Sequence, residues 1–447
     1  MIHDPTFETM AREQLRALQS DRLRMLAAYV YERVPFYRRR FDEAGIAPSD
    51  VRSLEDLPTL PFTVKSDLRD HYPFGLFAVP QNELARVHAS SGTTGRPTVV
   101  GYTRADIEVF AEVNARSLAM AGAEPGLMLH NAYGYGLFTG GLGLHYGAER
   151  LGMTVVPISG GMTERQLLVI GDFQPDVIAC TPSYALTLAH EFGKRGVSPE
   201  ELSLRFAVVG AEPWTEPMRT AIDAGLGVRA ANIYGLSEII GPGVSCECQE
   251  ERAGSHINED HFLPEIVDPV TREPLPEGAV GVLVFTTLTK QAMPLVRYWT
   301  GDLTSISSEP CSCGRTLVRM ASITGRTDDM LIIRGVNVFP TQVEEVLGRV
   351  EELSPHYQLV VSRDGTLDEL EVRAEVTEEF FRSVGIELLS DEAMEADHTL
   401  RGVRERVASL IKDTIGCTMQ VTLTAPGELP RSEGGKLARV DDRRPRV

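Results

Sequence analysis

The sequence contains no run of apolar residues long enough to span a bilayer, and its first residues contain no apolar signal core. It also contains no tract rich in lysine and arginine to offset its net charge of −19, which results from 63 acidic and 44 basic residues. Such an acidic balance disfavours nucleic acids and anionic membrane surfaces as partners. We therefore expect a cytoplasmic protein that binds neither nucleic acid nor a membrane, and that uses individual cations to bind any anionic ligand.

Cysteine is scarce as well. Six cysteines in 447 residues are too few for the disulfide framework of a small secreted protein. Four of the six form two Cys-x-Cys pairs, Cys246-Glu247-Cys248 and Cys311-Ser312-Cys313, and this grouping indicates a metal site rather than disulfide bonds. The other two, Cys180 and Cys417, are in or beside apolar segments that predict strands, so we expect them to be core residues.

The length and the 43% hydrophobic content are sufficient for a large core and at least two domains. Between about residues 151 and 235, short apolar runs alternate with amphipathic segments, which predicts parallel strands with crossover helices. After residue 241 the pattern predicts an antiparallel, barrel-like region, and after residue 328 it predicts an α+β unit. We therefore predict an α/β fold with a large N-terminal domain (residues 1–327) of mixed and parallel sheets and a small C-terminal domain (residues 328–447).

One short segment combines hydroxyls, glycines and a cation: Ser90, Ser91, Gly92, Thr93, Thr94, Gly95, Arg96, Pro97 and Thr98. Glycines let successive backbone N–H groups point into one concavity, and hydroxyls add donors around it, which is typical of a phosphate-binding loop. The segment is not a G-x-x-x-x-G-K-[ST] loop, because Pro97 stands where a phosphate-binding helix would begin. The next residues predict a strand, so we expect a hairpin connection that closes over the phosphates of a nucleotide. A plain flexible loop is the alternative.

Five further segments carry residues suited to nucleotide contacts, and several of them follow predicted strands, where ligands of parallel sheets bind. They are Gly210-Ala211-Glu212-Pro213, Tyr234-Gly235-Leu236-Ser237-Glu238, Tyr298-Trp299-Thr300-Gly301-Asp302, Gly325-Arg326-Thr327-Asp328-Asp329 and Pro430-Arg431-Ser432-Glu433-Gly434-Gly435-Lys436. The second offers an aromatic plane for a base and a carboxylate for a cation. The third offers an acid for ribose hydroxyls, and the last presents a lysine on a glycine-rich loop.

In this order and spacing, the motifs resemble those of the adenylate-forming enzymes, and most closely those of their phenylacetate–CoA ligase branch. The resemblance extends from about residue 34 to residue 444, and its most specific segments are Lys65–Arg69, Tyr133–Gly141 and Asp328–Pro340. It implies that a carboxylate attacks the α-phosphate of ATP, which gives an acyl-adenylate and pyrophosphate. The thiol of coenzyme A then displaces AMP.

The resemblance also implies roles for individual residues. The loop Ser90–Arg96 would bind the β- and γ-phosphates, with Thr94 near the α-phosphate or metal, and Arg96 stands where the family often has lysine. Glu238 would help to bind Mg²⁺. Glu212 and Tyr234 match adenine-site positions, and Asp302 and Arg326 match ribose contacts. The remaining residues of the implied nucleotide and coenzyme A sites are Gly210, Ala211, Gly235, Ser237 and Gly335.

The catalytic lysine of the family matches Lys436, which would bridge the substrate carboxylate and the α-phosphate during adenylation. Asp328 matches the hinge of a mobile C-terminal domain. Rotation at this hinge would withdraw Lys436 and bring the segment around Gly335 beside the pantetheine channel. A solvated lysine in a mobile tail is the alternative for Lys436.

The acyl pocket is expected to accept a flat aromatic acid, with phenylacetate as the first choice. Tyr133, Tyr135 and Phe138 lie in a glycine-rich stretch, where missing side chains leave room for a ring. By the family match, Tyr135 and Phe138 line the pocket together with Gly210. Ordinary core packing is the alternative for each aromatic residue.

The resemblance also selects ligands from the cysteine clusters. Four cysteines and His256 are more ligands than tetrahedral Zn²⁺ needs. Members of the branch carry a Glu-Cys pair where Glu247-Cys248 stands, so we select Cys248, His256, Cys311 and Cys313 as a structural zinc site and leave out Cys246. The spacing alone does not decide between Cys246 and Cys248, and free cysteines are the alternative.

The expected ligands are therefore an aromatic acid, ATP with Mg²⁺, and coenzyme A, in an enzyme that the branch suggests is a homodimer. Two other functions are compatible with parts of the pattern. An enzyme that loads a carrier protein or transfers AMP elsewhere would share the motifs, because a carrier and coenzyme A both present pantetheine. A non-catalytic nucleotide sensor is disfavoured by the joint presence of Glu238, Asp302, Arg326 and Lys436.

Overall fold

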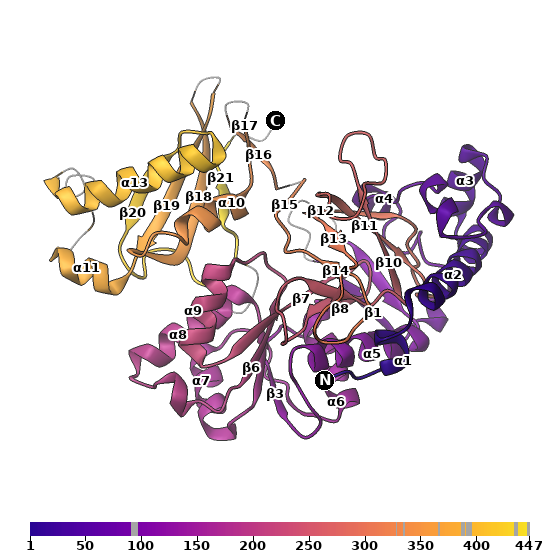
Figure 1. Cartoon of the computed structure of the whole chain (residues 1–447), viewed down its shortest axis with the longest axis horizontal. Coiled ribbons are helices and arrows are strands. Elements are labelled where there is room, and N and C mark those ends of the chain that lie inside the picture. The colour runs from indigo at the N-terminus through magenta and orange to yellow at the C-terminus, as the bar shows by residue number, and fades with distance from the viewer. Residues whose placement is uncertain are drawn as a thin grey trace.

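The computed structural model describes residues 1–90, 97–327, 329–333, 336–364, 367–385, 389, 396–432 and 437–444, without the side chains of residues 332, 337, 364 and 367. Figure 1 shows a large part and, at the upper left, a smaller part that contains the elements from α10 onward. Helices and strands alternate through most of both parts, which confirms the predicted α/β fold with a large N-terminal and a small C-terminal domain. The boundary at Asp328 stays a prediction, because this residue lies outside the described ranges.

The chain begins with helices. Leu15, Leu23 and Leu26 are buried on one face of α2. Val34 separates α2 from α3, because Pro35 cannot continue the hydrogen bonding of the preceding helix. The helical elements before the first strand pair are α1 (Pro5–Glu8), α2 (Arg12–Arg33), α3 (Pro35–Ala44), η1 (Pro48–Asp50), η2 (Leu54–Thr59), α4 (Lys65–Asp70) and η3 (Gln81–Glu83).

The largest sheet has nine strands in the order β13-β14-β9-β8-β7-β6-β5-β3-β4. Strands β4, β3, β5, β6 and β7 are parallel, and β8 then pairs antiparallel with β7. The strands are β3 (Met128–Asn131), β4 (Thr154–Val156), β5 (Val177–Cys180), β6 (Phe206–Gly210), β7 (Arg229–Leu236), β8 (Gly241–Glu247), β9 (Ser255–Ile257), β13 (Ile306–Ser307) and β14 (Arg319–Met320). The parallel strands with crossover helices are therefore present where the sequence predicts them.

Helices cover both faces of the parallel strands. In β5, Val177 and Ala179 pack in a core cluster with residues of α5 and α6, whereas Ile178 and Cys180 pack with residues of α7, α8 and α9. Burial on both faces explains why these strands are continuous apolar runs. The helices are α5 (Arg104–Met120), α6 (Thr139–Leu151), α7 (Thr163–Phe173), α8 (Pro182–Lys194), η4 (Pro199–Glu201) and α9 (Glu216–Leu226).

The predicted barrel-like region is an open antiparallel sheet in the order β10-β11-β12-β15. Its strands are β10 (Phe262–Val267), β11 (Gly281–Thr287), β12 (Tyr298–Thr304) and β15 (Gly325–Arg326). Within the described ranges its outer strands β10 and β15 do not pair with each other, so the sheet does not close into a barrel. Beside the large sheets lies the hairpin of β1 (Arg86–Ala89) and β2 (Val99–Tyr102).

The small domain has a sheet and a core of its own. Its sheet has the order β20-β19-β18-β21, and β16 and β17 form a separate pair. Leu359, Val372 and Val407 are fully buried between this sheet and its helices. The elements are β16 (Leu331–Ile333), β17 (Val336–Val338), α10 (Pro340–Leu347), β18 (Leu353–Asp364), β19 (Leu367–Val376), α11 (Glu378–Val384), α13 (His398–Ile415), β20 (Gln420–Thr424) and β21 (Val440–Asp442).

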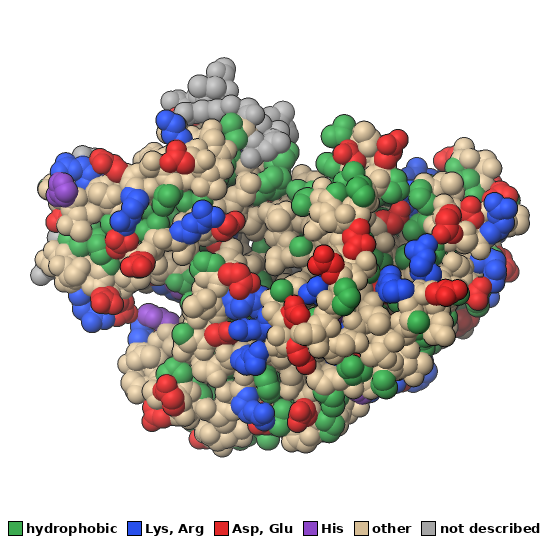
Figure 2. Space-filling model, in the orientation of Figure 1, with side chains coloured by type: hydrophobic (Ala, Val, Ile, Leu, Met, Phe, Trp, Pro, Cys, Tyr) green, Lys and Arg blue, Asp and Glu red, His purple; other side chains and the backbone are tan. Residues whose placement is uncertain are grey.

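The surface has no large segregation of charge on the face shown in Figure 2, where acidic and basic side chains are interspersed over both domains. None of the helices in the described ranges combines the length and the apolar composition that crossing a membrane requires.

Candidate functional site

The hairpin of β1 and β2 carries the predicted phosphate loop. Ala89 lies opposite Val99 in the antiparallel pair. The backbone N–H of Ser90 donates to the carbonyl of Thr98 (2.9 Å), and the N–H of Thr98 lies 3.3 Å from the Ser90 Oγ that accepts from it. The predicted hairpin connection is therefore present between these residues. The remaining residues of the motif lie outside the described ranges: Ser91, Gly92, Thr93, Thr94, Gly95 and Arg96.

The loop after β6 places the second motif at the carboxyl edge of the parallel strands. Gly210 is the last residue of β6, and a Cβ atom there would lie 2.0 Å from the carbonyl oxygen of Ile233 in β7. Only glycine allows this close approach of the two strands. Ala211 follows with a φ of 71°, in the left-handed region that non-glycine residues rarely adopt. Strain of this kind is common at ligand-binding loops.

Both carboxylate oxygens of Glu212, the next residue, are hydrogen-bonded. Oε2 accepts from the Oγ of Ser183 at the start of α8 (2.7 Å), and Oε1 accepts from the backbone N–H of Leu437 (2.7 Å). Leu437 directly follows Lys436, which lies outside the described ranges. The structure therefore places the end of the predicted lysine loop against the predicted nucleotide loop, 225 residues away in the sequence. An adenine contact of Glu212 stays a prediction.

Three predicted nucleotide residues, Tyr234, Asp302 and Arg326, form one polar cluster. The Tyr234 hydroxyl donates to Oδ2 of Asp302 (2.6 Å), and the Arg326 guanidinium donates to Oδ1 of Asp302 and to the carbonyl of Thr300. Burial, reinforced by the Asp302 charge, raises the pKa of Tyr234 well above its ordinary value, so the hydroxyl stays protonated and donates.

The placement of these residues in the strands differs from the prediction. The sequence predicts that Tyr234 and Asp302 come at or after strand ends, but β7 continues to Leu236 and β12 continues to Thr304. Asp302 lies opposite Arg326 in the register of β12 and β15. Their pairing across two strands holds the carboxylate and the guanidinium in contact, with Asp302 buried.

The end of β7 is packed closely against the start of β8. A Cβ atom on Gly235 would lie 1.8 Å from the carbonyl oxygen of Gly241. Ser237, in the turn between the strands, has its Oγ 3.2 Å from the Oγ1 of Thr139 at the start of α6. The motif is therefore joined to the helix that follows the predicted acyl-pocket stretch.

Glu238, the predicted Mg²⁺ ligand, has a buried side chain in the same turn. Burial, together with the charge of Glu238 and a hydrogen bond to it, raises the pKa of Tyr298 well above its ordinary value. The turn is next to the phosphate hairpin, because the Tyr102 hydroxyl of β2 donates to the carbonyl of Ile240 (2.8 Å). A carboxylate beside the predicted phosphate loop fits Mg²⁺, which takes one or two carboxylates together with phosphate oxygens and water.

The aromatic residues of the predicted acyl pocket lie between β3 and α6. The half-buried Tyr135 hydroxyl accepts from the Asn131 amide (2.9 Å) and lies 3.1 Å from the His145 Nδ1, and burial raises the pKa of Tyr135 to about 12. Phe138 is partly buried, with its ring 6.4 Å from that of the buried Tyr133. The structure thus places the rings of Tyr133 and Phe138 together and gives Tyr135 two polar partners, Asn131 and His145.

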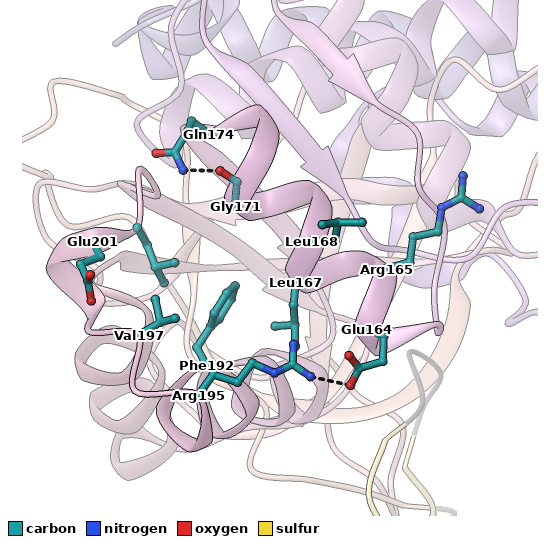
Figure 3. Close-up of a pocket in the computed structure, with 11 residues that line it drawn as sticks. Glu164, Arg165, Leu167, Leu168, Gly171, Gln174, Phe192, Arg195, Val197 and Glu201 are labelled. Atoms are coloured by element: carbon teal, nitrogen blue, oxygen red, sulfur yellow. Dashed lines mark hydrogen bonds and ion pairs between the residues drawn. The ribbon is translucent and has the colours of Figure 1, made fainter.

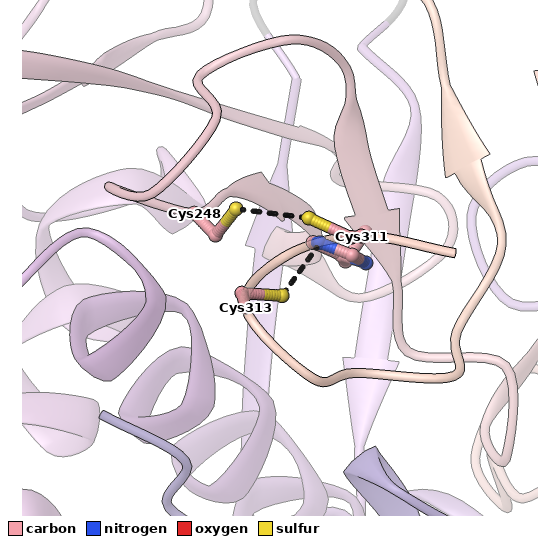
Figure 4. Close-up of side chains that lie close together, drawn as sticks. Cys248, Cys311 and Cys313 are labelled. Atoms are coloured by element: carbon pink, nitrogen blue, oxygen red, sulfur yellow. Dashed lines mark hydrogen bonds between the residues drawn. The ribbon is translucent and has the colours of Figure 1, made fainter. Parts of the chain in front are cut away.

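The predicted metal ligands also come together. The ligand atoms of Cys248, His256, Cys311 and Cys313 all lie within 4.8 Å of one another. Figure 4 shows the Cys248 and Cys311 sulfurs side by side. These two sulfurs are 3.6 Å apart, and the sulfur of Cys313 is 3.4 Å from the Nε2 of His256. Cys246, which was left out of the set, is buried in the core cluster with α5 and α6 instead.

The geometry of this cluster fits zinc. A Zn–S bond of about 2.3 Å in a tetrahedron places ligand atoms about 3.8 Å apart, close to the spacing observed here. His256 Nδ1 lies 3.3 Å from the carbonyl of Leu317, so a proton on Nδ1 leaves Nε2 free to bind a metal. The Cys248–Cys311 sulfur distance is far beyond a disulfide bond.

A surface pocket of about 560 Å³ lies away from these motifs, between α7, α8 and η4. Figure 3 shows Leu167 and Phe192 in its wall, with an ion pair of Glu164 and Arg195 at its edge. No predicted site residue lines it.

Two further residues contact the site although no pattern in the sequence predicts their contacts. Ser183 follows a Thr-Pro helix start, which predicts a cap but not a partner for Glu212. Lys290 stands in a polar segment after β11, which is typical of the surface, yet it is buried and donates to the backbone carbonyl of Glu238 (3.1 Å).

Known proteins resemble this chain over its whole length. The family model described as AMP-binding enzyme matches residues 39–289, and the model described as AMP-binding enzyme C-terminal domain matches residues 335–444. A phenylacetate-coenzyme A ligase of Thermus thermophilus is 72% identical over 444 residues, which are 99% of this chain and 100% of that protein. A phenylacetate-coenzyme A ligase of Aromatoleum evansii is 52% identical over 98% of this chain and 97% of that protein.

Among solved structures, 2-hydroxyisobutyryl-CoA ligase in the postadenylation state, in complex with 2-HIB-AMP, has a TM-score of 0.89 to this chain. It is 30% identical, and the match covers 98% of this chain and 92% of that chain. The same ligase in the thioesterification state, with 2-HIB-AMP and CoA, has a TM-score of 0.71 at the same identity and coverage. By these two scores, the present structure resembles the postadenylation arrangement more closely.

Proposed function

Because the chain belongs to the AMP-binding enzyme family, we propose that it is an ATP-dependent ligase that joins phenylacetate, or a related aromatic acid, to coenzyme A. The reaction passes through an acyl-adenylate and gives the acyl-CoA, AMP and pyrophosphate. The observation that carries the proposal is the 72% identity to the Thermus phenylacetate-coenzyme A ligase over the full length of that protein.

The polar cluster supports a nucleotide site at the edge of the large sheet. The Asp302 carboxylate is held in place by Tyr234 and Arg326. An ionised carboxylate has several acceptor positions, so Asp302 would accept hydrogen bonds from ribose hydroxyls. The loop after Ser90 would bind the β- and γ-phosphates. Glu238 would hold Mg²⁺, which when bound supplies positive charge to the phosphate oxygens.

The small domain supplies the adenylation lysine in this proposal. The hydrogen bond from Leu437 to Glu212 brings the residue after Lys436 to the nucleotide loop, which suits a lysine that bridges the acid and the α-phosphate. In-line transfer at phosphorus depends mainly on positioning and on stabilisation of developing charge. For thioester formation, the domain beyond residue 327 would rotate about Asp328 and bring the segment around Gly335 to the pantetheine channel.

We also propose that Cys248, His256, Cys311 and Cys313 hold one structural Zn²⁺. Three sulfurs and one imidazole nitrogen are a common ligand set for closed zinc sites, which contribute to folding rather than to chemistry. A homodimeric state, expected from the resemblance, and a cytoplasmic location, expected from the sequence composition, are further parts of the proposal.

The acyl pocket is predicted to prefer phenylacetate over octanoate. Tyr135 and Phe138 offer ring faces among glycines rather than the walls of a long tunnel, so a flat acid should be held better than an alkyl chain. Hydrophobic pockets discriminate by only about 1–3 kcal/mol per methylene, so several aryl acids should also react.

ATP–pyrophosphate exchange with phenylacetate, benzoate, hydroxylated phenylacetates and octanoate as competing acids would rank their kcat/KM values. We expect phenylacetate or a close aryl analogue to rank first. A higher kcat/KM for octanoate would contradict the aromatic pocket.

A further inference from the structure

Lys290 is a buried lysine with no role in the site as described so far. Only 4% of its surface is exposed, and its Nζ donates to the carbonyl oxygens of Glu238 (3.1 Å) and Ile239 (2.8 Å). A buried ammonium is costly unless it is hydrogen-bonded and compensated by opposite charge. These two hydrogen bonds go to the backbone of Glu238, the proposed Mg²⁺ ligand, and to the backbone of Ile239, the next residue.

The surroundings of Lys290 compensate its charge. The carboxylates of Asp106 and Glu238 act on it electrostatically, and the ring centroid of Tyr102 lies 4.9 Å from its Nζ. Burial lowers the pKa of Lys290 to about 8, and the two carboxylates oppose this shift. The ammonium form is therefore the main form at neutral pH.

The backbone beside Lys290 is fixed as well. The buried carboxylate of Asp106, in the first turn of α5, accepts from the backbone N–H groups of Gln291 (2.7 Å) and Ala292 (2.9 Å). The same carboxylate accepts from the N–H of Thr103, the residue that caps this helix. The backbone that carries Lys290 is thus anchored to the first turn of α5. This anchoring restricts the positions that the Lys290 ammonium group can reach.

Tyr102 completes the contacts to the turn. Its hydroxyl donates to the carbonyl of Ile240 (2.8 Å), so three successive carbonyls, those of Glu238, Ile239 and Ile240, each accept from a buried side chain. Tyr102 is the last residue of β2, the strand that follows the phosphate loop. Lys290 and Tyr102 therefore join the turn that carries Glu238 to the hairpin that carries the phosphate loop.

We propose that Lys290, assisted by Tyr102, is a positioning residue that fixes the turn so that the Glu238 carboxylate meets Mg²⁺·ATP at a set place relative to the phosphate hairpin. The inference rests on the proposed function, because Glu238 is assigned as a Mg²⁺ ligand only there. Contacts behind a ligating carboxylate generally govern metal affinity as well as orientation.

The test replaces the ammonium with an apolar chain of similar length, Lys290→Met. We expect the Mg²⁺ concentration for half-maximal ATP–pyrophosphate exchange to rise by about 10- to 100-fold, the range for loss of an outer contact to a metal ligand, while the rate at saturating Mg²⁺ changes much less. Calorimetric binding of a non-hydrolysable ATP analogue, without any acid, should require the same higher Mg²⁺ concentration. Lys194→Met, at an exposed lysine on α8 that pairs with Glu191, is the matched control and should change neither value.

Tyr102→Phe is the second variant, because it keeps the ring beside the ammonium and removes only the hydrogen bond to Ile240. It should raise the Mg²⁺ requirement in the same direction but by a smaller factor. A lower melting temperature with an unchanged Mg²⁺ requirement in Lys290→Met would overturn the proposal; if that variant does not fold, an unchanged requirement in Tyr102→Phe would do so. If the wild-type protein binds the ATP analogue with Mg²⁺ but catalyses pyrophosphate exchange with no aryl acid, the proposed function is contradicted instead. The Mg²⁺ requirement for binding the analogue, compared between the wild-type protein and the variants, then tests this inference by itself.

Discussion

Replacing Lys436 with alanine is expected to abolish acyl-adenylate formation while largely preserving thioester formation from supplied phenylacetyl-AMP. The lysine itself lies outside the described residues, but Leu437, the next residue, is hydrogen-bonded to Glu212 in the proposed nucleotide loop (2.7 Å). A cation at this place would act only while charge develops between the acid and the α-phosphate. Loss of such stabilisation costs about 100- to 1,000-fold in rate.

The two half-reactions separate this role from a structural one. Pyrophosphate exchange reports adenylation, and acyl-CoA formation from purified phenylacetyl-AMP reports the second step. Lys412→Ala, at an exposed lysine near the end of α13 in the same domain, should leave both rates at wild-type values. An equal loss of both half-reactions in Lys436→Ala would reject the assignment.

Replacing Cys248 with alanine is expected to remove bound zinc and to destabilise the large domain. The sulfur of Cys248 lies 3.6 Å from that of Cys311, and the three other ligands come from segments 8 to 65 residues further along the chain, so the ion would tie distant loops together. Loss of a structural metal belongs to the mechanisms that cost about 4 kcal/mol or more in unfolding free energy.

Cys246→Ala is the matched control, because Cys246 is buried two residues away but packs in the apolar core. It should keep about one zinc per chain and lose about 1 kcal/mol, the usual cost of a single substitution. Metal analysis and thermal unfolding of both variants, purified without chelators, would compare them. A wild-type protein without zinc, or equal metal contents and midpoints in the two variants, would reject the site.

The sequence predicts those features of the fold that depend on local patterns. Strands β5 and β6 are continuous apolar runs because both of their faces are buried, so their positions are evident without knowledge of their partners. The hairpin around the loop after Ser90 follows from the strand signal at Val99–Tyr102. The cysteine cluster is recognisable because the Cys-x-Cys pairs are themselves local.

Features that depend on distant pairing were predicted less well. Strand β7 extends past Tyr234 because β8 pairs with it, and Asp302 lies within β12 because β15 pairs beside it. No local pattern shows these partners. The same holds for Glu212, whose contacts Ser183 and Leu437 come from two other segments, and for Lys290, whose burial depends on Asp106 and Tyr102 rather than on its own neighbours.

This chain is expected to convert an aryl acid into its coenzyme A thioester through an adenylate. The most direct measurement incubates the purified full-length protein with phenylacetate, ATP, Mg²⁺ and coenzyme A, and follows phenylacetyl-CoA, AMP and pyrophosphate by mass spectrometry. We predict equal amounts of the three products, and pyrophosphate exchange that persists when coenzyme A is left out. Exchange without thioester formation would instead indicate transfer to a carrier protein or another acceptor. ATP binding without exchange for any aryl acid would contradict the proposed adenylation of an aryl acid.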